Sequence, residues 1–120
     1  MSKQAIKKNV NKADEVRTFE KGKAEIVNID GKVMGRTTFE PGWKWSTSLK
    51  ATAGTDSCQA PHTCYVISGK MHIAMDDGDG FDMGPGDISI IPPGHDAWVI
   101  GQEPCVMIDF TGLTHYAEKD

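Results

Sequence analysis

Cysteines and histidines have the widest range of chemistry in this chain, because thiolates and imidazoles bind metals and act in catalysis. There are three cysteines and four histidines, at Cys58, Cys64, Cys105, His62, His72, His95 and His115. The cysteines are odd in number and form no Cys-x-x-Cys pair, which indicates reduced thiols rather than a disulfide framework. His72 and His115 have no supporting spacing, so we expect surface or packing roles for both.

Two glycine-containing segments have the composition of ion-binding or phosphate-binding loops. The acidic segment from Asp76 to Asp82 lacks the central glycine and the final glutamate of an EF-hand, so we interpret it as a hairpin turn. Gly84-Pro85-Gly86 is not followed by Lys-Ser/Thr and a helix, which argues against a phosphate-binding loop.

Large apolar side chains could line a ligand pocket, since such pockets are mostly apolar with a few polar groups. The tryptophans Trp43, Trp45 and Trp98 are our candidates for substrate binding, with Tyr65 and Met71 as further apolar surface. Core packing is the alternative interpretation for all of them.

Composition and charge limit the class of protein. The 120 residues fit one domain, and 13 basic against 17 acidic residues give a net charge of −4. A protein with a negative net charge does not present the positive surface that nucleic acids need, so we expect no nucleic-acid partner. No apolar stretch approaches the roughly 20 residues that span a bilayer, and the basic N-terminus lacks a signal peptide's apolar run. We therefore expect no membrane partner and a cytoplasmic location.

Short strands separated by turns should position these side chains. Alternating apolar residues and the Asp30-Gly31 turn predict a hairpin from Lys23 to Phe39, and alternation from Trp43 to Ser48 predicts another strand. Ala51 to Pro61 has the composition of a loop, after which Pro61 favours an extended backbone and a strand beginning at His62. Further strands are predicted at residues 62–68, 70–75, 81–83, 88–91, 97–100 and 105–110. About nine short strands without helices of standard length indicate an antiparallel sandwich or barrel.

The two ends of the chain fall outside this pattern. We divide the chain into an N-terminal arm (1–22), a barrel (23–112) and a C-terminal tail (113–120). The arm shows only weak helical spacing, and the N-terminal hairpin would leave edge strands. Because edges are usually covered by pairing, we expect a homodimer.

Two motifs resemble those of the cupin superfamily. The segment Gly86-Asp87-Ile88-Ser89-Ile90-Ile91-Pro92-Pro93-Gly94 is similar to the second cupin motif, and His62-Thr63-Cys64-Tyr65-Val66-Ile67-Ser68-Gly69 is similar to the end of the first. The resemblance covers residues 39–110 and implies an all-β fold, a cupin-type double-stranded β-helix (jelly-roll) barrel of short antiparallel strands.

The resemblance also implies where metal ligands would lie, although the usual ones have been replaced. His62 occupies the place of the family's glutamate, and Asp56 and Cys58 occupy the places of its two histidines. Ala97 stands where the second motif keeps a histidine, and His95 lies two places earlier. The implied metal ligands are therefore Asp56, Cys58, His62 and His95, and their donor types favour zinc, iron, nickel or copper, with zinc as the default.

Three functions remain open from the sequence. The chain could be a metal-dependent small cupin acting on a small organic molecule, a metal-free cupin that binds or senses such a ligand, or a barrel used for its dimer surface. Fold alone does not choose between catalysis and binding, and the substrate is not specified.

Overall fold

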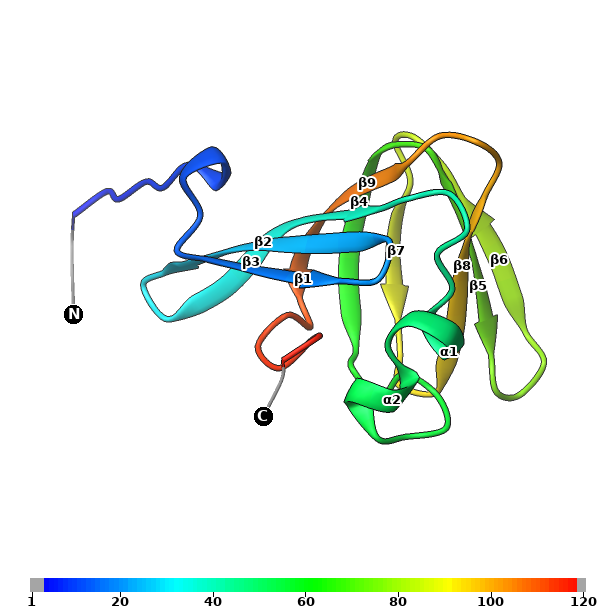
Figure 1. Ribbon diagram of the computed structural model, residues 1–120. Coiled ribbons are helices and arrows are strands. Elements are labelled where there is room, and N and C mark those ends of the chain that lie inside the picture. Colours follow the sequence, from blue (N-terminus) through cyan, green and yellow to red (C-terminus); the bar gives the residue numbers. More distant parts are fainter. Residues whose placement is uncertain (1–3, 119–120) are drawn as a thin grey trace.

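The computed structural model describes residues 4–118, which fold into nine strands and three short helical segments (Figure 1). In chain order these elements are η1 (Val10–Lys12), β1 (Glu15–Phe19), β2 (Gly22–Ile29), β3 (Lys32–Phe39), α1 (Trp45–Ser48), α2 (Lys50–Ala53), β4 (His62–Ser68), β5 (Lys70–Met75), β6 (Gly80–Met83), β7 (Ile88–Ile91), β8 (His95–Ile100) and β9 (Cys105–Thr111). No helix among them is long and apolar enough to cross a membrane.

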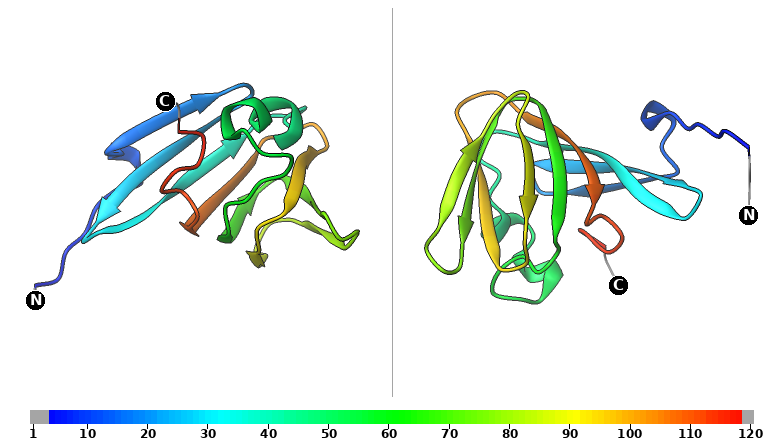
Figure 2. Two further views of the ribbon diagram at one scale, coloured as in Figure 1. Left: turned by 90° about the horizontal axis from the view of Figure 1, so that it is seen from below. Right: turned by 180° about the vertical axis from the view of Figure 1, so that it is seen from behind.

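The strands form two antiparallel sheets, as expected for a jelly-roll barrel. A six-stranded sheet has the order β1-β2-β3-β9-β4-β7, and a three-stranded sheet has the order β6-β5-β8. Figure 2 shows β1, β2 and β3 extending from one side of the barrel, while the remaining strands enclose its interior. The strand pattern predicted an antiparallel sandwich or barrel, and the motif resemblance implied the barrel; the all-β barrel is confirmed.

Period-2 alternation determines which side chains enter the barrel. On β8 the residues His95, Ala97 and Val99 are buried and the intervening ones are half-buried, and on β9 Cys105 and Met107 are buried in the same way. Because alternate side chains point to opposite faces of a strand, the buried set faces the barrel interior.

The N-terminal hairpin is confirmed, and it is preceded by a further strand. Asp30 and Gly31 both have positive φ, as a two-residue hairpin turn requires, and they join β2 to β3. Part of the region interpreted as an arm forms β1, which pairs with β2 along its length. Residues 1–3 of that arm and residues 119–120 of the tail lie outside the described part of the chain, and the domain boundaries remain predictions.

The strand predicted from Trp43 to Ser48 is wrong, because the chain turns into the helical segment α1 there. The backbone N–H groups of Thr47 and Ser48 both donate to the carbonyl of Lys44, at 3.0 and 2.8 Å. Trp43 and Trp45 are each 2% exposed. Two buried tryptophans on a turn therefore produced the same apolar–polar alternation in the sequence as a half-buried strand would. The first part of the predicted loop is likewise helical, as α2.

Candidate metal centre

Three of the four implied metal ligands converge at one end of the barrel. Cys58, His62 and His95 are all buried, and one potential ligand atom of each lies within 4.8 Å of the others. His62 begins β4 and His95 begins β8, so the ends of two strands in different sheets bring the imidazoles together.

Backbone hydrogen bonds fix Cys58 beside His95. The N–H of Cys58 donates to the carbonyl of His95 at 2.7 Å, and the N–H of Gly94 donates to the carbonyl of Cys58 at 2.7 Å. The hydroxyl of Ser57 donates to the carboxylate of Asp76 at 2.6 Å, which ties the same loop to the end of β5. The loop position of Cys58 is therefore held from both sides.

His62 faces a sulfur with one nitrogen and a carboxylate with the other. Its Nε2 lies 3.9 Å from Cys58 Sγ, and its Nδ1 lies 3.5 Å from Asp109 Oδ1. The side chain of Asp109 is almost fully buried on β9, and the hydroxyl of Thr37 approaches its other oxygen at 3.5 Å. Burial alone would lower the pKa of His62, but Asp109 and Cys58 raise it from 6.5 to about 10.

The same contacts make Cys58 unlike the other thiols. Burial would raise its pKa, but His62 and His95 lower it from 9.0 to about 6. Burial raises the pKa of Cys64 and of Cys105 to about 12. The two opposite shifts favour an ion pair of a Cys58 thiolate and a His62 imidazolium when no metal is bound.

His95 supplies the third donor. Its Nδ1 lies 3.0 Å from the carbonyl oxygen of Pro92, so Nδ1 carries the proton and donates, leaving Nε2 as the nitrogen that can accept a bond. The rings of His62 and His95 lie edge to face, with centroids 5.6 Å apart.

These donors fit a first-row transition metal. A thiolate and two imidazole nitrogens are zinc ligands, and three protein donors leave a position for water or substrate. His62 Nδ1 and Asp109 Oδ1 are buried and have no hydrogen bond to any other described residue. If Nε2 bound a metal, a proton on Nδ1 would face that carboxylate, the arrangement by which a carboxylate orients a ligating imidazole.

Asp56 lies apart from the other three. Its side chain is fully exposed, at 105% of the reference area, and it lies 3.8 Å from Lys50 Nζ. The resemblance implied Asp56 as a metal ligand, whereas the structure places it away from the other three residues, and the carboxylate that faces His62 is that of Asp109. Asp109 could have been noticed as a charged residue at an inward position of β9, where Cys105 and Met107 precede it in alternation.

Two spaces adjoin the donors. A cavity of about 660 Å³ opens beside Cys58, and a chamber of about 30 Å³ inside the barrel touches His62 and His95. The outer cavity has room for a small organic molecule, whereas the inner chamber holds about one water molecule. Trp45 and Tyr116 line both spaces and therefore separate them.

The three tryptophans have different surroundings. Trp45 lines both spaces and Trp43 lines only the inner chamber. Trp98 lies on the outer side of β8, where its ring packs on His72 at 4.7 Å and Lys44 Nζ lies 5.0 Å from its centroid. Trp98 lines neither space, because its neighbours Ala97 and Val99 take the inward positions of the strand.

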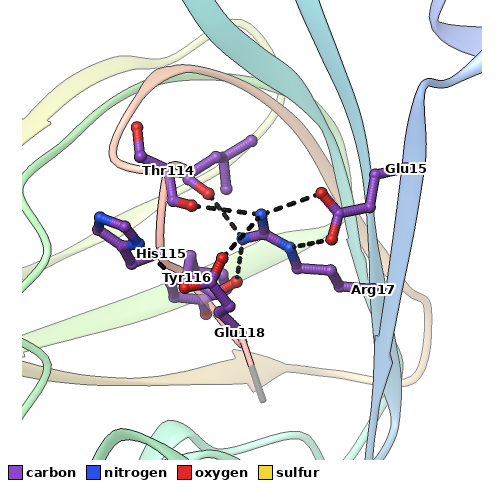
Figure 3. Close-up of polar contacts among 7 residues, drawn as sticks. Glu15, Arg17, Thr114, His115, Tyr116 and Glu118 are labelled. Atoms are coloured by element: carbon purple, nitrogen blue, oxygen red, sulfur yellow. Dashed lines mark hydrogen bonds and ion pairs between the residues drawn. The ribbon is translucent and has the colours of Figure 1, made fainter. Parts of the chain in front are cut away.

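Residues 113–118, here called the C-terminal strap, cover the site. Tyr116 within it is 8% exposed and places its ring edge-on to His62, with centroids 5.3 Å apart. Figure 3 shows how Arg17 of β1 holds this segment: its guanidinium donates to the carbonyls of Leu113, Thr114 and Tyr116 at 2.9, 3.2 and 2.8 Å. A strand from the N-terminal region thus fixes the wall of the site, which the sequence did not indicate.

Comparison with known proteins agrees with this architecture. The profile of the EutQ-like cupin domain family matches residues 47–106. No curated protein matches the chain.

Solved structures share the fold. A protein of unknown function from Acidithiobacillus ferrooxidans is 19% identical with a TM-score of 0.57, over 80% of this chain and 85% of that one. The polyketide cyclase RemF from Streptomyces resistomycificus is 17% identical with a TM-score of 0.61, over 88% and 78%. A variant of oxalate decarboxylase from Bacillus subtilis is 25% identical with a TM-score of 0.59, over 86% of this chain but only 29% of the larger enzyme.

Proposed function

The chain belongs to the EutQ-like cupin domain family, and from that premise we propose that its barrel binds a small organic ligand beside a divalent transition metal. Cys58, His62 and His95 would hold the metal, and Asp109 would orient His62. The observation that supports this most directly is the convergence of one thiol and two imidazoles within 4.8 Å, with the second nitrogen of each imidazole facing an oxygen. A metal in such a site supplies Lewis acidity to a bound water or carbonyl.

Zinc is the default metal, with iron, nickel and copper as the other candidates. A thiolate with two imidazoles is a softer donor set than carboxylates, which disfavours magnesium and calcium. Metal binding must displace the proton that His62 holds below its pKa of about 10, and below the pKa of Cys58 at about 6 it must displace a second one. Affinity should therefore fall as the pH drops, and more steeply below about pH 6.

The ligand class follows from the walls of the outer cavity. Apolar walls are provided by Trp45, Leu49, Ala53 and Pro61, and hydrogen-bonding groups by Thr52, Thr55, Gln59 and Thr114. Glu118 contributes a carboxylate, which His115 and Arg17 contact at 3.0 and 3.7 Å, and none of the described residues lining this cavity is a lysine or arginine. We therefore propose a neutral or cationic organic ligand rather than a dianion such as oxalate.

Metal content provides the test. Protein without a histidine tag, grown with zinc, iron, nickel and copper, is analysed for bound metal beside Cys58→Ala and Cys105→Ala. Both thiols are buried, so the variants are matched for loss of volume. We expect near-stoichiometric metal in the parent and in Cys105→Ala, and a loss of most of it in Cys58→Ala. Metal-free parent protein, or equal metal in both variants, would contradict the proposed site.

A metal-free binding or sensory cupin is the second candidate. It is favoured by the Cys58–His62 pair, in which each charge already has a partner without a metal. Metal-free protein that retains a co-purified small molecule would support this alternative.

We also propose that the chain is a cytoplasmic homodimer that binds neither nucleic acid nor membranes. The reduced state of all three buried cysteines is compatible with a reducing compartment. The net charge of −4 disfavours attraction to nucleic acid and to anionic lipid surfaces.

A further inference from the structure

The wall between the outer cavity and the inner chamber contains a hydrogen-bond donor without a partner. Tyr116 lines both spaces, and its side chain belongs to a residue that is only 8% exposed. Its hydroxyl forms no hydrogen bond with any other described residue. A buried tyrosine hydroxyl usually has a partner, so the absence of one here indicates that the partner comes from outside the protein.

The position of Tyr116 is fixed without its hydroxyl. Its backbone N–H donates to the carbonyl of Leu113 at 3.3 Å, and its carbonyl accepts from Arg17 at 2.8 Å, as Figure 3 shows for Arg17. Its ring lies edge-on to the rings of His62 and Phe19, with centroids 5.3 and 6.3 Å away. Phenylalanine would make all of these contacts, so the hydroxyl is available for another interaction.

Other polar side chains of the outer cavity do not share this property. The hydroxyl of Thr55 donates to the carbonyl of Ser57 at 2.7 Å, and the amide of Gln59 donates to the hydroxyl of Ser57 at 3.0 Å. Thr52 and Thr114 are exposed, so water can satisfy their hydroxyls. The buried hydroxyl in the wall therefore differs from these groups in lacking both a protein partner and free access to bulk water.

An organic molecule can reach this hydroxyl from the outer cavity. In the described part of the chain, the unpartnered side-chain atoms that are completely enclosed are Trp43 Nε1, Ser48 Oγ, His62 Nδ1 and Asp109 Oδ1. The Tyr116 hydroxyl is not one of them, so it keeps contact with accessible space. The inner chamber holds about one water molecule, which leaves the outer cavity as the space for a larger partner.

The neighbours of the hydroxyl define the chemistry of that partner. A neutral phenol donates a hydrogen bond, so the partner needs an acceptor atom. Cys58 lines the same cavity, and His62 lies against the Tyr116 ring, so the acceptor would lie beside the proposed metal ligands. A carbonyl oxygen accepts hydrogen bonds and is also polarised by a Lewis-acidic metal. The lack of lysine and arginine among the described residues lining the cavity disfavours a dianion.

We propose that Tyr116 is a ligand-binding residue, whose hydroxyl donates a hydrogen bond to the carbonyl oxygen of a neutral organic ligand in the outer cavity. This inference rests on the proposed function and names the class of its ligand. A molecule of the same size without an acceptor oxygen would leave the buried hydroxyl without a partner, and it should bind less tightly for that reason.

Binding of acetohydroxamic acid tests the proposal, because this probe is a small neutral carbonyl compound whose oxygens also bind zinc. Calorimetry with the zinc-loaded full chain gives its dissociation constant in the parent, in Tyr116→Phe and in Tyr65→Phe. Tyr65 is the matched control, because it is 39% exposed on the outer side of β4. We expect the dissociation constant to rise about tenfold in Tyr116→Phe and to stay unchanged in Tyr65→Phe, with equal zinc content in all three proteins.

A second measurement does not require Tyr116→Phe to fold. Tyr65 and Tyr116 are the two tyrosines of the chain, so protein labelled with carbon-13 at the tyrosine Cζ position gives two signals in nuclear magnetic resonance. The spectrum of Tyr65→Phe assigns them. The Cζ atom carries the hydroxyl, and its chemical shift responds to hydrogen bonding there. We expect the probe to move the Tyr116 signal of the parent and to leave the Tyr65 signal in place.

The outcomes separate this inference from the proposed function. Failure of the zinc-loaded parent to bind the probe overturns the inference, as does an unchanged affinity in Tyr116→Phe or a Tyr116 signal that does not move while the probe is bound. Equal weakening in Tyr65→Phe, or loss of zinc from Tyr116→Phe, also counts against it, because the effect would then not come from the hydroxyl. A parent that holds no zinc overturns the metal site instead. Probe binding with a shifted Tyr116 signal in such metal-free protein would still support the role of the hydroxyl.

Discussion

The acidity of Cys58 should depend on Asp109, a residue that does not touch it. Asp109 lies 3.5 Å from His62 Nδ1, and His62 Nε2 lies 3.9 Å from Cys58 Sγ. Replacement by asparagine in Asp109→Asn keeps the shape of the side chain and removes its charge. In metal-stripped protein the imidazolium then loses its counter-charge, and the thiolate in turn loses its imidazolium.

The size of the effect follows from the distances. Two unit charges 3.5 Å apart attract by about 5 kcal/mol at an effective dielectric constant of about 20, which equals about 3.5 pKa units. Asp109→Asn should therefore return the pKa of His62 from about 10 to roughly 6.5 or below. His62 is then largely neutral at pH 7, and the pKa of Cys58 should rise from about 6 by about one unit or more.

Alkylation by iodoacetamide as a function of pH measures this directly, because only the thiolate reacts. Mass spectrometry of the peptides separates Cys58 from Cys64 and Cys105, whose pKa values of about 12 keep them unreactive in the same tube. We expect the midpoint of Cys58 alkylation near pH 6 in the parent and at about pH 7 or higher in the variant.

Asp82→Asn is the matched control. Asp82 also places a carboxylate oxygen beside a histidine, 2.6 Å from His72 Nδ1, but it does so on the exposed side of the barrel. Asp82→Asn should leave the midpoint pH of Cys58 alkylation the same as in the parent protein. An unchanged midpoint in Asp109→Asn would refute the coupling through His62, and an equal change in both variants would show that the effect is not local.

Two further predictions concern the cover of the site. Arg17→Gln should speed alkylation of Cys58 several-fold, because it removes the donors that hold the C-terminal strap. Arg36→Gln breaks an ion pair with Glu25 and a hydrogen bond to Asn11, both away from the strap, and should not speed it. Equal rates in the two variants would show that the strap does not limit access. Gly112→Ala should lower the free energy of unfolding in urea by about 3 kcal/mol, because the residue has a φ of +96° and its Cβ would overlap a backbone carbonyl. Gly54→Ala, with a φ of +74° and open space around it, should cost only about 1 kcal/mol, and similar losses in both would contradict the steric argument.

The strand pattern of this chain could be predicted because it depends on neighbours in the sequence. Asp30-Gly31 specifies a two-residue turn wherever the surrounding chain lies, and the alternation in β9 separates an inner from an outer face by itself. The same kind of prediction was wrong at Trp43 and Trp45. The sequence pattern of two buried residues on one turn is the same as that of two alternate buried residues on a strand.

Part of the candidate site could also be predicted from the sequence. Cys58, His62 and His95 lie at the ends of predicted strands or in the loop before one, and the motif resemblance placed them near one another. Trp98 could have been excluded as a pocket residue if His95 had been assigned to the strand, since alternation from His95 makes Ala97 inward and Trp98 outward.

The sequence by itself determined the all-β barrel, the turns, and the thiol and imidazoles of the candidate site. Only the tertiary structure decided that Asp109 rather than Asp56 faces His62, and that Tyr116, held by Arg17, covers it. The reason is physical: periodicity records which face of a strand a side chain takes, but contacts between residues 47 or more positions apart depend on strand order and on how the chain ends pack. The direction of a loop carboxylate such as Asp56 is likewise set by the surface around it, which no local pattern encodes.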